Sequence, residues 1–246
     1  MHPLQQALRK KARSEKIPIY QNFFKTGKGE YAEGEVFIGV TVPDTRAVAK
    51  QFSEITLSDV STILKSPVYE DRMAALIILV NKFQTAKTES EKKNIVDFYL
   101  EHHSAGNNWG LIDCIVDKIL GPWLIDKDKS LLYTYAKSEN LWERRMSIIT
   151  TFNFIKNNQF DETLHIAELL LKDKHDLIHK AVGWMLREVG KKDVDVLKLF
   201  LKKHSHEMPR TMLRYAIERF PEKERKAYLN VKAQTSRLRS IFSNKS

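Results

Sequence analysis

The sequence predicts an all-α protein, a right-handed superhelical solenoid of HEAT-like helix pairs. Apolar residues recur with the period of an amphipathic helix through most of the 246 residues. A motif of an aromatic residue, Glu, any residue, Arg and Met begins at Tyr69 and again, 73 positions later, at Trp142. Another apolar helix opens 36 positions further on, at Ile178. Two-helix repeats of about 30 to 50 residues are typical of such solenoids. A compact helical bundle without repeats is the alternative.

The amino-terminal part is expected to hold short helices around a glycine-rich loop. Apolar residues at helical spacing, with basic residues between them, predict a first helix over residues 3–16. A second helix over residues 17–25 is rich in aromatic residues and ends at Gly27. Residues 29–40 lack a helical period and are predicted to form a loop that packs on the helices. A new helix begins near Pro43, because proline is favoured in a first helical turn.

The rest of the chain consists of successive helical segments without a convincing strand. In each segment, apolar residues three and four positions apart define one buried face. The expected helices span residues 42–55, 57–65, 69–83, 89–102, 108–120, 129–137, 141–156, 161–171, 177–189, 194–203, 209–220 and 222–229.

We expect a single domain over residues 1–230, followed by a basic and flexible tail over residues 231–246. No apolar run approaches the roughly 18 residues of a membrane span, and the amino terminus lacks the apolar stretch of a secretion signal. These features indicate a cytoplasmic protein. The one cysteine, Cys114, excludes an intrachain disulfide and is expected to be a small buried apolar residue.

The chain is basic, with 41 Lys and Arg against 31 Asp and Glu and a formal net charge of +10. Such a charge favours a polyanionic partner, either nucleic acid or an anionic membrane surface. The membrane option requires a basic amphipathic helix, and residues 232–246, the nearest candidate, hold too few apolar residues. Basic residues and tryptophans recur on helices predicted to face the concave side of the solenoid, a combination that suits nucleic acid. They are Arg72, Arg144, Arg145, Lys180, Arg187, Lys191, Arg210, Arg214 and Arg219, with Trp109, Trp142 and Trp184.

One helix carries a tryptophan and a carboxylate side by side. The asparagines at 107 and 108 can cap it, and Trp109 and Asp113 then lie at positions i and i+4 of one face. The apolar positions of this helix, among them Ile112 and Ile119, form its core without Asp113. Asp113 is therefore a candidate for chemistry. The alternative is that Asp113 is an ordinary solvated residue and that Trp109 fills a groove.

The sequence lacks the patterns of several enzyme classes. The eight histidines are scattered and have no matched ligands at metal-binding spacing, so neither a metal nor another cofactor is expected. No serine-hydrolase, P-loop or dinucleotide-binding motif is present. A carboxylate between tryptophans in a basic trough fits the cleavage of an N-glycosidic bond, because it stabilises the positive charge that develops on the sugar. An alkylated base that is already cationic leaves as a neutral molecule and needs no general acid.

Four stretches resemble the bacterial DNA alkylation repair glycosylases of the AlkD type. They are Gly29-Glu30-Tyr31 through Phe37-Ile38-Gly39-Val40, Trp109-Gly110-Leu111-Ile112-Asp113, Leu141-Trp142-Glu143-Arg144-Arg145 and Lys180-Ala181-Val182-Gly183-Trp184-Met185-Leu186-Arg187-Glu188. The resemblance runs from about residue 2 to residue 220. It implies a HEAT-like superhelix, acting as a monomer, that removes 3-methyladenine- and 7-methylguanine-type lesions from duplex DNA without drawing the base into a pocket.

The resemblance also implies roles for individual residues. Asp113 is the expected catalytic carboxylate, and Trp109 and Trp184 are expected to pack against the sugar of the lesion nucleotide. Tyr31 is the expected aromatic contact from the amino-terminal helices, and Arg145 is expected to hold the DNA backbone near the lesion. Further backbone contacts are expected from the basic row, namely Arg144, Arg72, Lys180, Arg187 and Lys191.

Two other hypotheses remain open. Some relatives with this fold lack the catalytic Asp, so the chain can also be a non-catalytic protein that recognises the DNA backbone or structured DNA. A HEAT scaffold that binds acidic peptides is the third hypothesis; such a protein would have no affinity for DNA at about 0.15 M salt.

Overall fold

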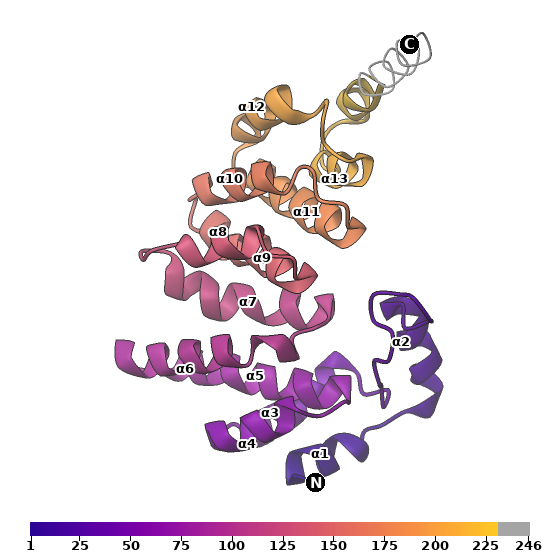
Figure 1. Cartoon of the computed structure of the whole chain (residues 1–246), viewed down its shortest axis with the longest axis vertical. Coiled ribbons are helices and arrows are strands. Elements are labelled where there is room, and N and C mark those ends of the chain that lie inside the picture. The colour runs from indigo at the N-terminus through magenta and orange to yellow at the C-terminus, as the bar shows by residue number, and fades with distance from the viewer. Residues whose placement is uncertain (231–246) are drawn as a thin grey trace. The chain divides into compact units, whose positions relative to one another are not determined.

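The computed structural model describes residues 1–230, and these are helices joined by loops, with no strand among them (Figure 1). The prediction of an all-α protein with paired helices is confirmed. A single parallel bridge joins Val36 to Val68. Within the described range, no helix has the length and apolar character needed to cross a membrane. The predicted basic tail, residues 231–246, lies outside the described residues.

The contacts within the chain divide it into two compact units, Met1–Trp123 and Leu124–Ser246. We call them unit 1 and unit 2. The helices of unit 1 are α1 (Pro3–Arg9), α2 (Ile17–Phe24), α3 (Val42–Gln51), α4 (Leu57–Leu64), α5 (Tyr69–Thr85), α6 (Glu89–Glu101) and α7 (Trp109–Leu124), with the 3-10 turns Ser14–Lys16 and His103–Ala105.

Helix α5 is the centre of unit 1. It packs against α1, α3, α4 and α6, and its apolar residues from Met73 to Val80 are all buried. A helix that is apolar around its whole circumference is stable only inside a protein, which explains its central position. Figure 1 shows α2 beside the stack that α3 to α6 form.

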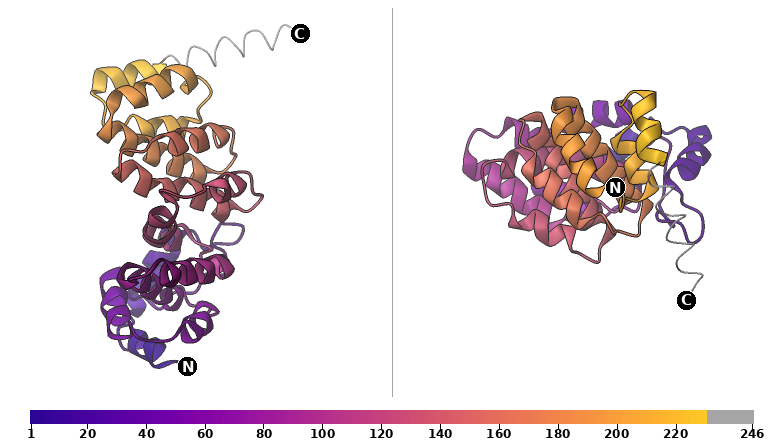
Figure 2. Two further views of the ribbon diagram at one scale, coloured as in Figure 1. Left: turned by 90° about the vertical axis from the view of Figure 1, so that its left-hand side faces the viewer. Right: turned by 90° about the horizontal axis from the view of Figure 1, so that it is seen from above.

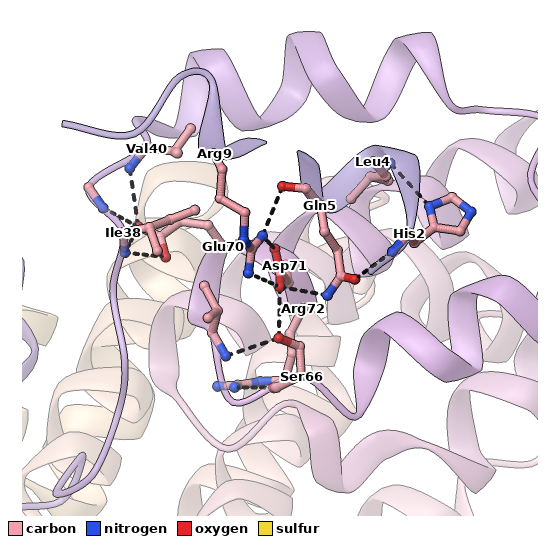
Figure 3. Close-up of polar contacts among 12 residues, drawn as sticks. His2, Leu4, Gln5, Arg9, Ile38, Val40, Ser66, Glu70, Asp71 and Arg72 are labelled. Carbon is pink, nitrogen blue, oxygen red and sulfur yellow. Dashed lines mark hydrogen bonds and ion pairs between the residues drawn. The ribbon is translucent and has the colours of Figure 1, made fainter. Parts of the chain in front are cut away.

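The first turn of α5 holds the glycine-rich loop through Glu70. The buried carboxylate of Glu70 accepts hydrogen bonds from the backbone N–H groups of Ile38, Gly39 and Val40, at 2.9 to 3.2 Å (Figure 3). Gly39 has a φ of 79°, and a Cβ at this position would overlap the carbonyl oxygen of Arg13. Only glycine therefore fits where this loop crosses the segment after α1.

The next residue, Asp71, anchors α1. Its carboxylate accepts two hydrogen bonds from the Arg9 guanidinium, at 2.6 and 2.9 Å, and one from Gln5 at 2.8 Å. The hydroxyl of Ser66 donates a further bond at 2.7 Å (Figure 3). Because the Asp71 side chain is fully buried, these four bonds supply the solvation that water no longer provides.

The prediction of one helix over residues 3–16 is wrong in its second half. Helix α1 ends at Arg9, and Arg13 is extended, with φ −135° and ψ 99°. In this conformation the N–H of Arg13 donates to the Ile38 carbonyl, at 3.2 Å, instead of continuing the helix. A contact with a distant loop, which the local period does not reveal, thus ends the helix early.

The labelled helices of unit 2 are α8 (Ser130–Ala136), α9 (Leu141–Lys156), α10 (Asp161–Leu169), α11 (Asp176–Lys192), α12 (Val194–His204) and α13 (Arg210–Ala216), and residues 222–230 are also helical. Helix α9 packs against α8, α10 and α11, and α11 packs against α12 and α13. Figure 1 shows α8, α10 and α12 in one layer and α9, α11 and α13 in the other, and Figure 2 shows the same helices from two further sides.

The repeat is visible as a shared hydrogen bond. The fourth residue of α5, α9 and α11 bonds to the carbonyl oxygen six residues earlier in each case. The pairs are Arg72 with Ser66 at 3.0 Å, Arg144 with Ser138 at 2.9 Å, and His179 with Asp173 at 2.6 Å. Helices α5 and α9 begin 72 positions apart, whereas the sequence motif recurs after 73. This bond relates Arg72 to Arg144, whereas burial and a bond to a later carbonyl oxygen, that of Ala105 or Leu177, relate Arg72 to Arg145.

Candidate functional site

Helix α7 presents Trp109 and Asp113 on its half-buried face. Asn108 is buried and starts the helix: its side-chain oxygen accepts a hydrogen bond from the Gly110 N–H at 3.1 Å. This matches the predicted cap. The opposite face is the core, where Ile112 is 1% exposed and its apolar neighbours on that face are equally buried. Trp109 and Asp113 are both half-buried, so the helix leaves them accessible while its apolar face fixes its position.

The indole of Trp109 is held by three contacts. Its Nε1 donates a hydrogen bond to the hydroxyl oxygen of Tyr31 at 3.0 Å. Its ring lies tilted against Phe24, with 4.9 Å between ring centroids, and meets Phe23 edge-on at 5.3 Å. The structure thus brings Tyr31, from the glycine-rich loop, next to Trp109.

Phe24 belongs to an aromatic cluster, with Phe37 and Tyr69, that packs against Trp109 through the Phe24 ring. Phe24, Phe37 and Tyr69 lie with their ring centroids 5.0 to 5.3 Å apart. Burial raises the pKa of Tyr69 well above its ordinary value, so its hydroxyl stays neutral. A Cβ on Gly110 would overlap that hydroxyl and would lie 3.0 Å from a Phe24 ring carbon. Glycine after Trp109 therefore lets α7 approach the cluster closely.

Cys114, the residue after Asp113, is half-buried and not fully buried as predicted. Burial raises the pKa of its thiol, and the negative charges of Asp113 and Asp117 act in the same direction. Lys118 opposes them, because its positive charge favours the thiolate. The net shift keeps the thiol protonated at neutral pH and argues against a reactive cysteine.

Arg72 lies inside unit 1, where the sequence placed it among surface contacts to the DNA backbone. It is 6% exposed, and its guanidinium forms a 2.6 Å ion pair with Glu35 of the glycine-rich loop. It also donates to the Ala105 carbonyl and to the side-chain oxygen of Asn107, at 3.2 Å each. Because these donors are used within the unit, Arg72 connects the loop of Tyr31 to the turn before Trp109 and is not a surface cation.

In unit 2, the two predicted arginines of α9 are also held by internal bonds. The Nε of Arg144, which is half-buried, donates to Asp173 at 2.6 Å. Arg145 is 4% exposed, and its Nη1 donates to the Leu177 carbonyl at 2.6 Å. Both guanidiniums join α9 to the start of α11.

The predicted residues of α11 share one helix. Trp184 is half-buried, its ring centroid lies 5.7 Å from that of Phe152, and its Nε1 donates to Glu188 at 3.2 Å. The basic residues pair with acidic side chains: Lys180 with Asp176 at 2.7 Å, Lys191 with Glu188 at 2.7 Å, and Arg187 with Glu188 at 3.4 Å and with Glu218. Such pairs near the surface are weak and can exchange for other anions.

Sequence reasoning missed the part that Glu35, Phe23 and Phe24 play around Trp109. The local sequence gives no signal for Glu35, because the loop has no periodicity. The run Tyr20-Gln21-Asn22-Phe23-Phe24 did give a signal for Phe23 and Phe24. A helix that packs with one face needs apolar residues on that face only, and this run has more of them. Within residues 1–230, no group of three or more His, Cys, Asp and Glu side chains is arranged to hold a metal ion.

One protein-family model matches most of the chain. The family model described as DNA alkylation repair enzyme matches residues 4–220. A solved structure described as a predicted DNA alkylation repair enzyme from Enterococcus faecalis is similar, with a TM-score of 0.67 and 15% sequence identity, over 86% of this chain and 98% of that one. At that identity the similarity shows the fold alone. No curated protein matches the chain.

Proposed function

Because the chain belongs to the DNA alkylation repair enzyme family, we propose that it is a DNA N-glycosylase that excises cationic alkylpurines from duplex DNA. The family assignment gives it a role in the repair of alkylated DNA. The proposed substrates are lesions of the 3-methyladenine and 7-methylguanine type, and the reaction is the hydrolysis of the bond between base and sugar, the first step of base excision repair.

The observation that carries this proposal is the pairing of Asp113 with Trp109. The carboxylate lies one helical turn from an indole whose orientation Tyr31 and Phe24 hold. An indole face can pack against a deoxyribose, which would present the sugar to the carboxylate. A fixed negative charge is useful there, because it needs no rearrangement when positive charge develops on the sugar.

The reaction needs few groups. The bond between C1′ and the base nitrogen breaks, and the bonding electrons leave with the cationic base, which becomes neutral. Asp113 stabilises the resulting oxocarbenium-like sugar, water adds to C1′, and its proton passes to Asp113 or to solvent. No general acid is required, so a single carboxylate is sufficient.

The proposed contacts with the DNA backbone are made by basic residues. Lys180, Arg187 and Lys191 can exchange their weak ion pairs on α11 for phosphates, which releases counterions from the DNA. Trp184 on the same helix is proposed to pack on the sugar of the lesion nucleotide. Arg144 and Arg145 are already held by internal bonds, so any contact they make with the backbone must leave those bonds in place. Arg72 is proposed to support the site from inside unit 1, because it connects the loop of Tyr31 to the turn before Trp109.

The decisive experiment measures release of 7-methylguanine from a duplex that contains one such base, with the wild type and Asp113→Asn side by side. We expect the wild type to release the base and Asp113→Asn to release none while binding the duplex as before. A wild type that binds the duplex and releases nothing would favour the non-catalytic DNA-binding hypothesis. Release at the wild-type rate by Asp113→Asn would remove Asp113 from the mechanism.

A further inference from the structure

The groove between α10 and α12 is a feature that no step of the proposed reaction uses. It lies within unit 2, between two helices of the same layer (Figure 1). We propose that this groove binds a carboxyl-terminal segment of the same chain, residues 237–242. The proposal is independent of the proposed glycosylase function, because it involves neither DNA nor the site at Trp109.

The groove has a volume of about 390 Å³ and is lined largely by apolar side chains. Leu164 contributes from α10, and Val196, Leu199 and Phe200 contribute from α12. Phe200 is buried, whereas Leu199 is 69% exposed. A hollow of this size, with large apolar side chains in its walls, is typical of a binding site.

Polar contacts fix the two walls at one end of the groove. The carboxylate of Glu168, on α10, accepts a hydrogen bond from Nζ of Lys203 at 3.0 Å and lies 2.9 Å from Nε2 of His204, both on α12. The other ring nitrogen of His204 lies 2.9 Å from Glu207, and its ring packs on Phe200 with 4.7 Å between centroids. The walls are therefore held in position before anything binds between them.

The charge of the walls does not favour nucleic acid. Helices α10 and α12 together carry four carboxylates and three lysines. Of the residues that line the groove, Asp161 and Glu168 are acidic and Lys203 is basic. The groove therefore offers no cationic surface to a polyanion, and it does not repel a basic segment.

Residues 231–246, which lie outside the described part of the chain, contain a matching sequence. Leu238, Ile241 and Phe242 have the i, i+3, i+4 spacing with which one face of a helix enters an apolar groove. No acidic residue accompanies them. The basic residues of this stretch are Lys232, Arg237, Arg239 and Lys245.

The described chain ends near the groove. Glu224, in the helical residues 222–230, forms a 3.4 Å ion pair with Lys198, the neighbour of Leu199 on α12. From Glu224 the helix continues for six residues, about 9 Å, and a helix such as α12 is about 10 Å across. The way back past Glu224 and around α12 is thus about 20 Å. Residues 231–237 span up to about 23 Å when extended, so the segment after them reaches the groove.

Attachment to the same chain favours this segment over other occupants. A segment held so close to its site by a short linker has an effective concentration in the millimolar range. The same segment of a second copy, or a different protein, would have to compete with it from solution. The groove would thus hold in place a segment that the sequence alone predicts to be flexible.

The test measures how fast trypsin cleaves the full-length protein at Arg237 and Arg239, by mass spectrometry of the released peptides. A docked segment must leave the groove before the protease can cleave it. We expect Leu199→Ser to accelerate this cleavage about tenfold, because it removes apolar surface that the segment covers. Leu169→Ser is the matched control: Leu169 is 45% exposed on α10 but does not line the groove, so its replacement should leave the rate unchanged.

A second variant tests the segment itself. Leu238→Ser combined with Phe242→Ser should accelerate cleavage as Leu199→Ser does. The three substitutions together should add little more, because both sets remove the same contact. Melting temperatures equal to that of the wild type confirm that unit 2 is folded in each variant. The rate for the wild type should not depend on protein concentration, since the segment and the groove belong to one chain.

Several results would overturn the proposal. One is an equal cleavage rate in the wild type, in Leu199→Ser and in Leu238→Ser with Phe242→Ser. Another is protection that is lost on dilution, because the segment would then occupy the groove of a second copy. By contrast, protection that depends on Leu199 and on Leu238 in a protein that releases no 7-methylguanine supports the proposal and rejects the glycosylase function alone.

Discussion

The indole nitrogen of Trp109 donates a 3.0 Å hydrogen bond to the hydroxyl oxygen of Tyr31, 78 positions earlier in the chain. The bond joins the first turn of α7 to a loop without regular structure. Arg72 joins the same two segments a second time, because its guanidinium contacts both Glu35 and Asn107. The orientation of the indole therefore depends on residues that do not touch it.

Tyr31→Phe should leave Trp109 without this acceptor. We expect a loss of roughly 1 kcal/mol in the free energy of unfolding, the usual contribution of one such hydrogen bond. Base release should slow mainly through kcat if the indole positions the sugar. Urea unfolding and single-turnover kinetics measure the two effects. Tyr133→Phe, which changes a half-buried tyrosine of α8, is the control, and an equal effect of both variants would contradict the prediction.

Arg72→Ala should be strongly destabilising, because it leaves the Glu35 carboxylate buried without its cation. Breaking a buried ion pair in this way costs about 3 to 5 kcal/mol. The combination with Glu35→Gln should cost clearly less than the sum of the two single changes. Urea unfolding of the four proteins measures this coupling. Additive effects would show that the ion pair does not join the loop to α5.

Gly110→Ala should destabilise unit 1 by about 1 to 3 kcal/mol, because the added methyl group overlaps the Tyr69 hydroxyl. Tyr69→Phe removes the overlapping atom and should restore part of the loss. It cannot restore all of it, since a Phe24 ring carbon lies 3.0 Å from the same methyl position. Thermal unfolding of the single and double variants provides the comparison. Equal stability of Gly110→Ala and the wild type would argue against the close approach.

Lys180→Gln and Lys191→Gln should each weaken DNA binding and reduce the salt slope by about 1, if each lysine exchanges its acidic partner for a phosphate. Lys223→Gln changes an exposed lysine outside the proposed contacts and serves as the control. Titrations of an undamaged duplex at several salt concentrations give the slopes. Slopes identical to that of the wild type would exclude the two lysines from the interface.

Glu70 should give stability a distinctive pH dependence. Burial raises the pKa of Glu70, although the hydrogen bonds from residues 38–40 act in the opposite direction. A carboxyl whose pKa is higher in the folded than in the unfolded protein stabilises the fold at low pH, and this contribution is lost as pH rises through the raised pKa. The wild type should therefore lose stability relative to Glu70→Gln as pH rises above the ordinary pKa of a glutamate, 4.5. Urea unfolding from pH 4 to 8 measures the free energy of unfolding of both proteins. A wild type that gains stability relative to Glu70→Gln as pH rises would contradict this prediction.

The helical period was sufficient to predict the fold class and the face shared by Trp109 and Asp113, because both depend on local spacing. The environment of Arg72 could not be predicted in this way. Its counter-charge, Glu35, lies 37 positions earlier in a loop without periodicity, so the sequence suggested an exposed cation. The sequence motif predicts the repeat to within one residue, because it recurs after 73 positions while the helices begin 72 positions apart.

The first turn of α5 has a consequence for how the chain acquires its structure. Residues 69–72 contact the aromatic cluster, the glycine-rich loop, α1 and the turn before α7. The partner of Arg9, for example, lies 62 positions later in the chain. During synthesis the first helices leave the ribosome before any of these anchors exists. These first helices can pack only once α5 has left the ribosome. Amino-terminal fragments that end before residue 69 should therefore remain unstructured.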